Sequence, residues 1–240
     1  MAADGSGVLN LSRGHAADAA WSPDGQRLAF VSNRGGTVEL YTVHVSGADP
    51  VGPLTSTGAS SPDWSPDGTR LTFVSAGGRI TVANADGTNA TPITAGVDAG
   101  PRWRPDGSAI VYSHRVTFAN RDVFVVSPNG ASNINITNTT KTSEIAAFWS
   151  PDGTRLAIEG GTDTNPEIYV VSETGAGLVN LTQTATADRH PRWSPDGTLI
   201  SFVSTGTDEE IYTVPSTGGT VVNVTNHTGS DSMAVWRPRR

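Results

Sequence analysis

Short apolar runs that alternate with polar residues recur along the whole chain, and glycine or proline bounds most of them. The stretch AAWSPDGQRLAFVS (19–32) is typical, with a run ending in tryptophan, then Ser-Pro-Asp-Gly, then a run in which Leu28 and Phe30 alternate with their neighbours. Alternation with a period of two predicts strands, and proline, aspartate and glycine in this order favour a tight turn. The stretch therefore predicts a β-hairpin with Gly25 at positive φ.

This hairpin pattern returns along the chain at spacings of 43, 39, 46, 44 and 43 residues. It contains every tryptophan of the chain: Trp21, Trp64, Trp103, Trp149, Trp193 and Trp236. A turn glycine follows each of the first five: Gly25, Gly68, Gly107, Gly153 and Gly197. Repeats of about 40 to 45 residues with four strands each are typical of propeller blades. We expect these residues to be structural, with the tryptophans packed between blades.

Each repeat supplies four candidate strands, named A to D here. Strand A ends in the tryptophan, strand B follows the turn, strand C (VELYTVHV, 38–45) carries an acid before an apolar-aromatic pair in four of five repeats, and strand D is short (GPLTS, 52–56). We expect one all-β domain over 1–240, a β-propeller of four-stranded blades. Five blades would be complete and a partial sixth would come from 7–12 and 232–238, joining the two ends of the chain. The repeat units fall at about 13–56, 57–95, 96–139, 140–183 and 184–227.

The order W-S-P-D-G, L-x-F-x-S, E-I-Y-x-V and N-L-T, found in five copies over 7–238, resembles the TolB-like (PD40) propeller repeats. The resemblance implies a six-bladed ring closed by a C-terminal strand, a periplasmic or extracellular location and a non-enzymatic role in protein binding. Two strands that it implies before residue 7 are not found in the sequence, and five blades are the competing count. An incomplete blade would leave a seam through which the chain could form a homo-oligomer.

Charge and composition narrow the classes of partner. The net charge is −7, and the terminal RPRR is the one cluster of basic residues, which argues against nucleic acid and against an anionic membrane surface. The chain has no cysteine for disulfides or thiolate metal sites and no apolar run long enough to insert in a membrane. Its first residues do not form a signal peptide, so we expect that a targeting segment has been removed.

Candidate chemistry lies in the loops. In a propeller the D-to-A connections and the B-to-C loops share one rim of the central channel. Four acids stand five residues before a tryptophan: Asp98, Glu144, Asp188 and Asp231. Together they would favour a basic partner segment or a calcium ion, so they are partner-binding candidates and weak metal candidates. In the alternative interpretation each carboxylate accepts hydrogen bonds within its own loop. No other cofactor is expected.

Three histidines join the predicted rim. The resemblance implies that His15, six residues before Trp21, contacts a peptidoglycan-associated lipoprotein. His190 lies three residues before its tryptophan, and His114 belongs to 113–122, which we expect to be the longest B-to-C loop and a binding loop. Other acids near strand C, such as Glu167 and Glu210, are expected to form a solvated rim.

These features favour a non-enzymatic scaffold that binds a protein or peptide through its channel-mouth loops. One alternative is a metal-dependent polysaccharide lyase or hydrolase of the propeller type. Against it, no two histidines have short metal-ligand spacing and no G-x-S-x-G elbow occurs. A second alternative is an excised or engineered repeat fragment without a function of its own.

Overall fold

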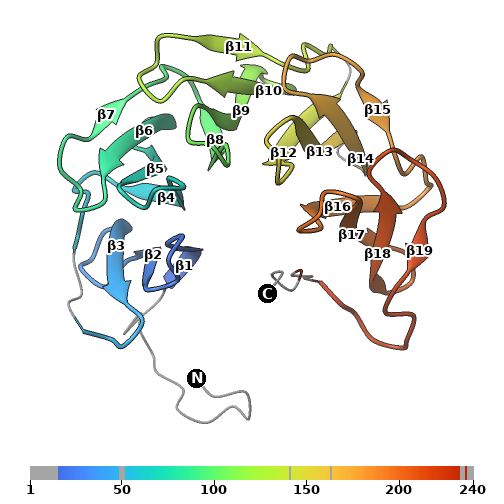
Figure 1. Cartoon of the computed structure of the whole chain (residues 1–240), viewed down its shortest axis with the longest axis horizontal. Coiled ribbons are helices and arrows are strands. Elements are labelled where there is room, and N and C mark those ends of the chain that lie inside the picture. Colours follow the sequence, from blue (N-terminus) through green and yellow to red (C-terminus); the bar gives the residue numbers. More distant parts are fainter. Residues whose placement is uncertain (1–15, 49–51, 141, 163, 233–235, 237–240) are drawn as a thin grey trace. The chain divides into compact units, whose positions relative to one another are not determined.

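The computed structural model describes residues 16–48, 52–140, 142–162, 164–232 and 236. In this part of the chain the regular structure consists of nineteen β-strands, all paired antiparallel where their register is defined, and no helix (Figure 1). The chain forms two compact units, one of Met1–Trp103 with Pro128–Gly130 and one of Arg104–Ser127 with Ala131–Arg240. No helix in the described residues is long and apolar enough to cross a membrane.

The first unit holds two sheets and the start of a third. The first sheet consists of β1 (Ala16–Trp21), β2 (Arg27–Ser32) and β3 (Glu39–His44) in chain order. The second consists of β4 (Ala59–Trp64), β5 (Arg70–Ser75), β6 (Arg79–Asn84) and β7 (Thr91–Pro92). Strand β8 (Asp98–Trp103) begins the third sheet and packs against β4, β5 and β6. Each A strand in this unit after the first thus covers the sheet before it.

The second unit continues the same pattern. The third sheet goes on with β9 (Ile110–Thr117), β10 (Asn120–Val126) and β11 (Asn133–Asn135). The fourth contains β12 (Ser143–Trp149), β13 (Arg155–Thr162), β14 (Asn165–Ser172) and β15 (Val179–Asn180), and the fifth β16 (Ala187–Trp193), β17 (Leu199–Thr205), β18 (Glu209–Pro215) and β19 (Val222–Asn223). Strand β12 packs on β9 and β10, and β16 on β12, β13 and β14. Four-stranded meanders stacked through their A strands confirm the predicted propeller repeats.

The first sheet has one strand fewer than predicted in the described residues. Leu54 of the expected D strand donates its N–H to the Leu40 carbonyl oxygen at 2.7 Å, as Ile93 does to Ile80 at 2.8 Å in the second sheet. Gly52, two residues before Leu54, has φ of +141°, which lies outside the β region. Residues 7–12 and most of 232–238, predicted to form the partial sixth blade, lie outside the described residues.

The predicted turns are confirmed in atomic detail. In the first, the Ser22 hydroxyl donates to Asp24 Oδ1 at 2.6 Å and accepts the Arg27 N–H at 2.8 Å, and Asp24 Oδ1 accepts the Gln26 N–H at 3.0 Å. Gly25 has φ of +68°, and the glycines of the other four turns lie between +69° and +75°. The Ser65 hydroxyl and the Thr69 N–H lower the pKa of the equivalent Asp67 to about 2. These aspartates therefore stabilise the turns by hydrogen bonds.

Tryptophans link successive repeats. Three indole N–H groups donate to a backbone carbonyl oxygen of the preceding repeat, and in each case the acceptor is the residue just before that repeat's tryptophan. The pairs are Trp64 with Ala20 (3.2 Å), Trp193 with Phe148 (3.0 Å) and Trp236 with Arg192 (3.1 Å). Trp103 and Trp149 are also buried. Trp21 departs from the prediction because 62% of it is exposed. A tryptophan is buried by the sheet that precedes it, and the described residues contain no sheet before β1.

Candidate functional site

The B-to-C hairpins and the D-to-A connections lie at the same end of the sheets within each unit. At three places an N–H at or near the start of an A segment donates to a carbonyl oxygen at the start of a C strand. Ala59 donates to Val38 (3.1 Å) and Asp98 to Gly78 (2.7 Å), each just before the C strand, and Asp231 donates to Glu209 (2.6 Å), the first residue of β18. Because the strands are antiparallel, the W-S-P-D-G turns lie at the opposite end. We call the end that carries the B-to-C hairpins and the D-to-A connections the hairpin end.

A threonine organises this end in every repeat, lying two residues after strand D in four repeats and at Thr55 in the first. Its Oγ1 accepts the N–H of a strand C residue at 2.9–3.1 Å, in the pairs Thr55 with Leu40, Thr94 with Ile80, Thr137 with Val123, Thr182 with Ile168 and Thr225 with Ile211. The same hydroxyl donates to a buried carboxylate, which belongs in chain order to Glu39, Asp98, Glu144, Glu167 and Glu210. Buried carboxylates need such donors, so these acids hold the fold.

Several acids of the predicted rim therefore occupy other positions than expected. Asp98, Glu144 and Asp188 lie inside the A strands β8, β12 and β16, and all three are buried. Threonine hydroxyls bind them, with Thr142 on Glu144 at 2.7 Å and Thr184 on Asp188 at 2.9 Å. The expected loop position was wrong because strand A begins as many as six residues before its tryptophan.

The acids of strand C are not solvated either. Glu167 and Glu210 are buried and bound by threonines, which corrects the expected solvated rim. The Thr225 hydroxyl lowers the pKa of Glu210, whereas burial raises the pKa of Glu144 against the opposing effect of three threonine hydroxyls. Within the described residues no three His, Asp or Glu side chains form a group that could hold a metal ion.

Two of the histidines and one acid near the predicted rim have defined partners. His190 is an exposed residue of β16 with φ of +57°, and its N–H donates to Glu159 Oε2 at 2.9 Å. His227 Nε2 lies 2.9 Å from Asp231 Oδ2. Asp231 follows β19 in a connection and is partly exposed, unlike the other three acids of the predicted set. His15 lies outside the described residues. The partner-binding roles of these residues stay predictions.

The segment 113–122 is a hairpin instead of a long loop. Strand β9 runs to Thr117 and β10 begins at Asn120, which leaves Phe118 and Ala119 as the turn. His114 lies in β9, and its ring centroid is 5.0 Å from that of Phe124 on β10. The turn itself is open, because 98% of Phe118 and 47% of Val116 are exposed. We call residues 115–119 the hairpin tip.

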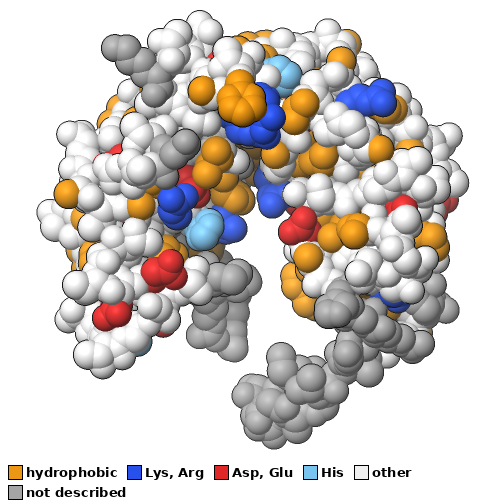
Figure 2. All heavy atoms as spheres, turned by 180° about the vertical axis from the view of Figure 1, so that it is seen from behind, with side chains coloured by type: hydrophobic (Ala, Val, Ile, Leu, Met, Phe, Trp, Pro, Cys, Tyr) orange, Lys and Arg blue, Asp and Glu red, His pale blue; other side chains and the backbone are white. Residues whose placement is uncertain are grey.

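Exposed hydrophobic side chains lie beside basic ones on the face of the molecule in Figure 2. At the hairpin tip the sequence combines these two kinds of group, because exposed Arg115 is next to Val116 and three positions before Phe118. An aromatic ring and a cation on a rigid hairpin can bind an apolar side chain that carries or neighbours a negative charge.

Each of these threonine hydroxyls joins a strand C N–H to a buried carboxylate, and we call this arrangement the threonine bridge. The sequence analysis missed it although its signal was present. The triplets N-I-T, N-L-T and N-V-T at 135–137, 180–182 and 223–225 repeat in strand D. In the structure Asn180 Oδ1 accepts the Thr182 N–H at 3.1 Å, and Asn223 Oδ1 accepts the Thr225 N–H at 3.2 Å. The asparagine shapes the end of strand D and the threonine joins it to strand C, so the triplet is structural.

A family model for the TolB beta propeller domain (PD40) matches residues 1–142 and 78–240. The comparison with curated proteins gave no match. Among solved structures, a protein described as TolB from Agrobacterium tumefaciens is similar at 21% identity and a TM-score of 0.71, over 88% of this chain and 80% of that one. TolB from Acinetobacter baumannii is similar at 20% identity and a TM-score of 0.72, over 95% of this chain and 59% of that one. An oligogalacturonate lyase in complex with manganese is similar at 16% identity and a TM-score of 0.50, over 87% of this chain and 76% of that one. At 16–21% identity, these similarities show a shared fold.

Proposed function

The chain belongs to the TolB beta propeller domain family, and from this premise we propose that it is a non-enzymatic module that binds a protein or peptide at its hairpin end. The observation that carries the proposal is Phe118, an aromatic side chain that is 98% exposed on the hairpin tip. Leaving a phenylalanine side chain in water forgoes about 1.5–3 kcal/mol of burial free energy. A partner that covers the ring recovers this free energy.

The geometry of the tip supports binding over a packing role. The strands behind it are paired, with Arg121 opposite Arg115 and Asp122 opposite His114, and the register shifts between Asn120 and Arg121. The ladder behind the tip restricts its backbone, which reduces the conformational entropy lost when a partner binds. Exposed aromatic and arginine side chains on a rigid support are the residues that dominate binding energy at interfaces.

The partner segment is proposed to be apolar and acidic. Arg115 is exposed three residues before Phe118, and it gives the tip a local positive charge on a chain whose net charge is −7. An acidic segment would be attracted to the tip and repelled by much of the remaining surface, which gives it a defined orientation. The family resemblance supports a periplasmic or extracellular place for this encounter.

A photo-crosslinking experiment tests the proposal. A photoreactive phenylalanine analogue at position 118 should capture a discrete partner, and the same analogue at position 179 should not, although Val179 is 49% exposed on the D strand β15. The partner, once purified, should bind the Phe118→Ala variant about 10-fold or more weakly and the Val179→Ala variant with unchanged affinity. Equal affinity for Phe118→Ala and wild type would overturn the proposal.

An enzymatic assay separates the main alternative. Purified protein with manganese is incubated with oligogalacturonate, and unsaturated product is followed by its ultraviolet absorbance. No turnover above the metal-only control is expected. Turnover that a chelator abolishes would favour the lyase interpretation and remove the present one.

We also propose the six-blade layout, with Trp236 opening the sixth repeat. The indole N–H of Trp236 reaches the Arg192 carbonyl as its counterparts do in complete repeats, and Trp21 offers an exposed face on the first sheet. An incomplete sixth blade predicts association of two copies through this face. Sedimentation should give a dimer mass that falls to the monomer mass in Trp21→Ser, whereas a clean wild-type monomer would contradict the association.

A further inference from the structure

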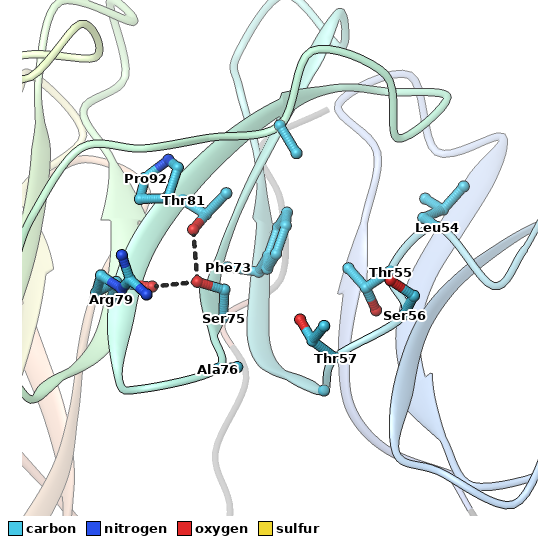
Figure 3. Close-up of a pocket in the computed structure, with 12 residues that line it drawn as sticks. Leu54, Thr55, Ser56, Thr57, Phe73, Ser75, Ala76, Arg79, Thr81 and Pro92 are labelled. Atoms are coloured by element: carbon cyan, nitrogen blue, oxygen red, sulfur yellow. Dashed lines mark hydrogen bonds between the residues drawn. The ribbon is translucent and has the colours of Figure 1, made fainter.

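Two cavities of the first unit differ in whether their polar groups are already bound. In the larger one, of about 400 Å³, the Thr81 hydroxyl donates to Ser75 at 2.7 Å and the Ser75 hydroxyl donates to the Arg79 carbonyl oxygen at 3.3 Å (Figure 3). The smaller one, of about 300 Å³, lies at the end of the second sheet that carries the W-S-P-D-G turn, and its lining includes Arg70 and Asn89. Neither of these two side chains makes a hydrogen bond to another described residue, so the smaller cavity holds unused donors.

Arg70 is the first residue of β5 and stacks on the tryptophan of the next repeat. Its guanidinium carbon lies 4.6 Å from the centre of the Trp103 ring, which is only 6% exposed. Arg155 has the equivalent place in the fourth repeat, where its guanidinium carbon lies 4.8 Å from the centre of the Trp193 ring. A guanidinium donates hydrogen bonds in its own plane, so the buried ring supports one face and leaves the N–H groups available.

In the fourth repeat these N–H groups bind the neighbouring turns. Arg155 donates to the Ser216 carbonyl oxygen at 3.2 Å, to the Ser216 hydroxyl at 3.2 Å and to the Gly197 carbonyl oxygen at 3.3 Å. Ser216 belongs to the turn between strands C and D of the fifth repeat. The oxygen atoms that this guanidinium needs are thus supplied by the protein itself.

The turn beside Arg70 lacks the serine. The segments T-V-P-S-T-G (213–218) and V-V-S-P-N-G (125–130) align on a final glycine of positive φ, at +88° and +75°. Pro128 therefore stands where the fifth repeat has Ser216, and a proline side chain offers no oxygen. Within the part of the chain that the structure describes, the Arg70 guanidinium has no hydrogen-bond acceptor and no ion pair. A guanidinium that is held in place with its donors unused is suited to bind oxygen atoms from outside the chain.

A ligand can reach this arginine. Arg70 is partly exposed, and three polar lining residues are fully accessible from the solvent side: Asn89, Thr91 and Asn129. Ile93 and Pro128 are partly exposed and add a small apolar surface. The cavity thus offers a charged donor, an amide and an apolar wall, which is the usual make-up of a small-molecule site.

Two acids of the neighbouring turns limit the charge of the ligand. Asp67 Oδ1 accepts the Thr69 N–H at 3.0 Å, and Asp86 Oδ1 accepts the Thr88 N–H at 2.9 Å, so both carboxylates are bound within their own turns. Neither lines the cavity, and among the described residues neither forms an ion pair with Arg70. Their charges oppose a second negative charge beside Arg70, which favours a monocarboxylate over a phosphate or a dicarboxylate.

We propose that this cavity binds a hydroxycarboxylate with a single negative charge, its carboxylate on the Arg70 guanidinium and its hydroxyl groups on the Asn89 amide. The oxygen atoms of the ligand take the place that the Ser216 oxygen atoms have beside Arg155. Guanidinium binds carboxylate through two parallel hydrogen bonds, which gives the ligand a defined orientation. The inference does not depend on the partner surface at Phe118.

The test uses threonate, a four-carbon acid with three hydroxyl groups, titrated at constant ionic strength into isotope-labelled protein and followed by amide chemical shifts. Saturable shifts are expected at Asn84, Asn89, Thr91 and Asn129, with a dissociation constant of about 1–10 mM. Threitol lacks the carboxylate and butyrate lacks the hydroxyl groups, so each should bind about 5-fold or more weakly. Absence of saturable binding by threonate, or equal affinity for threonate and either analogue, would overturn the proposal.

Pro128→Ser returns an acceptor to the guanidinium and is the sharpest variant. It should weaken threonate binding about 10-fold while the amide spectrum stays that of the folded protein, so loss of the fold cannot explain the loss of binding. Arg70→Gln should also weaken binding about 10-fold, whereas Arg115→Gln, which removes the same charge at the hairpin tip, should bind as wild type does. Unchanged binding by Pro128→Ser or Arg70→Gln, or shifts at Arg115 that equal those at Asn89, would contradict the assignment.

Discussion

Replacing Asp63 by asparagine should stabilise the protein at pH 8 more than at pH 4.5. Asp63 lies in β4, immediately before Trp64, and its Oδ2 accepts the Trp103 N–H of β8 at 2.8 Å. Burial raises the pKa of this carboxyl to about 6, although the Arg102 charge and the Trp103 N–H act in the opposite direction. An asparagine has nearly the same shape and still offers an oxygen to the Trp103 N–H, but it has no charge to desolvate.

The sign follows from proton linkage. The folded pKa is above the ordinary value of 3.8, so the folded state binds the proton more tightly than the unfolded state. The stability that protonation provides is complete below pH 3.8 and is lost as the pH rises through about 6. The full shift corresponds to about 3 kcal/mol, of which about 2 kcal/mol is lost between pH 4.5 and pH 8. Partial exposure of the side chain reduces the expected difference to about 1–2 kcal/mol.

Urea unfolding of wild type and Asp63→Asn at both pH values measures this difference. Asp67→Asn, four residues away, is a control of opposite sign, because hydrogen bonds lower the pKa of Asp67 to about 2. The stability that Asp67 contributes is present above pH 3.8 and is lost as the pH falls toward 2, so its asparagine variant should lose stability at pH 8. A gain by Asp63→Asn that is equal at pH 4.5 and pH 8, or a measured pKa near 4 for Asp63, would refute the reasoning.

Three further substitutions test the repeat, each by the free energy of unfolding in urea. Thr182→Val should cost about 2–3 kcal/mol, because it leaves the Ile168 N–H and the buried Glu167 carboxylate without the hydroxyl that binds them. Thr182→Ser keeps a hydroxyl and should cost less than about 1 kcal/mol. Similar costs for the two variants would contradict the role of the hydroxyl. Gly25→Ala should cost about 1 kcal/mol at φ of +68°, and no change would contradict the turn. Trp193→Phe should cost about 1 kcal/mol or more, because the indole N–H bond to the Phe148 carbonyl is lost, whereas Trp21→Phe should change the free energy of unfolding by less than about 0.5 kcal/mol. Equal costs would contradict the conclusion that each tryptophan is buried by the preceding sheet.

Features that recur unchanged in several copies could be predicted from the sequence. The Ser-Pro-Asp-Gly turn depends on residues within five positions of one another, so its conformation follows from local chemistry, and Gly25 shows the expected positive φ. The tryptophan packing also followed for the internal repeats. It failed at Trp21 because burial there depends on a preceding sheet, which the residue's own repeat cannot supply.

The roles of the acids could not be predicted because they depend on which side chain reaches a given hydroxyl. Thr182 binds Glu167 of its own sheet. Thr137 instead binds Glu144 of the next A strand, since the strand C acid of its own sheet is Asp122, one methylene shorter, which binds Asn135 at 2.6 Å. Counting positions from the tryptophan gives no information on this choice. The distances between side chains decide it.

The hairpin tip was misjudged for a related reason. The two turn residues, Phe118 and Ala119, are not the glycine or asparagine that usually signals a two-residue turn, and the segment 113–122 is longer than its counterparts, so it suggested a loop. Val116 and Thr117 are β-branched, and the β9–β10 ladder continues as far as Thr117 and Asn120. Extending the ladder moves Phe118 away from the body of the sheet. The extra length therefore produces an exposed aromatic ring on a rigid support.

The second repeat shows how a repeat keeps its fold when the acid of strand C is replaced. Its Thr94 hydroxyl must still donate to a carboxylate, and Asp98 of the following A strand supplies one, so Arg79 can replace the strand C acid. Thr81 stays buried and donates to Ser75 at 2.7 Å, so its hydroxyl is satisfied, and the Phe73 ring opposite it is only 2% exposed. Both exchanges keep the buried polar groups bound and the buried ring covered, so the fold tolerates Arg79 and Thr81 at positions where the other repeats have an acid and an aromatic residue.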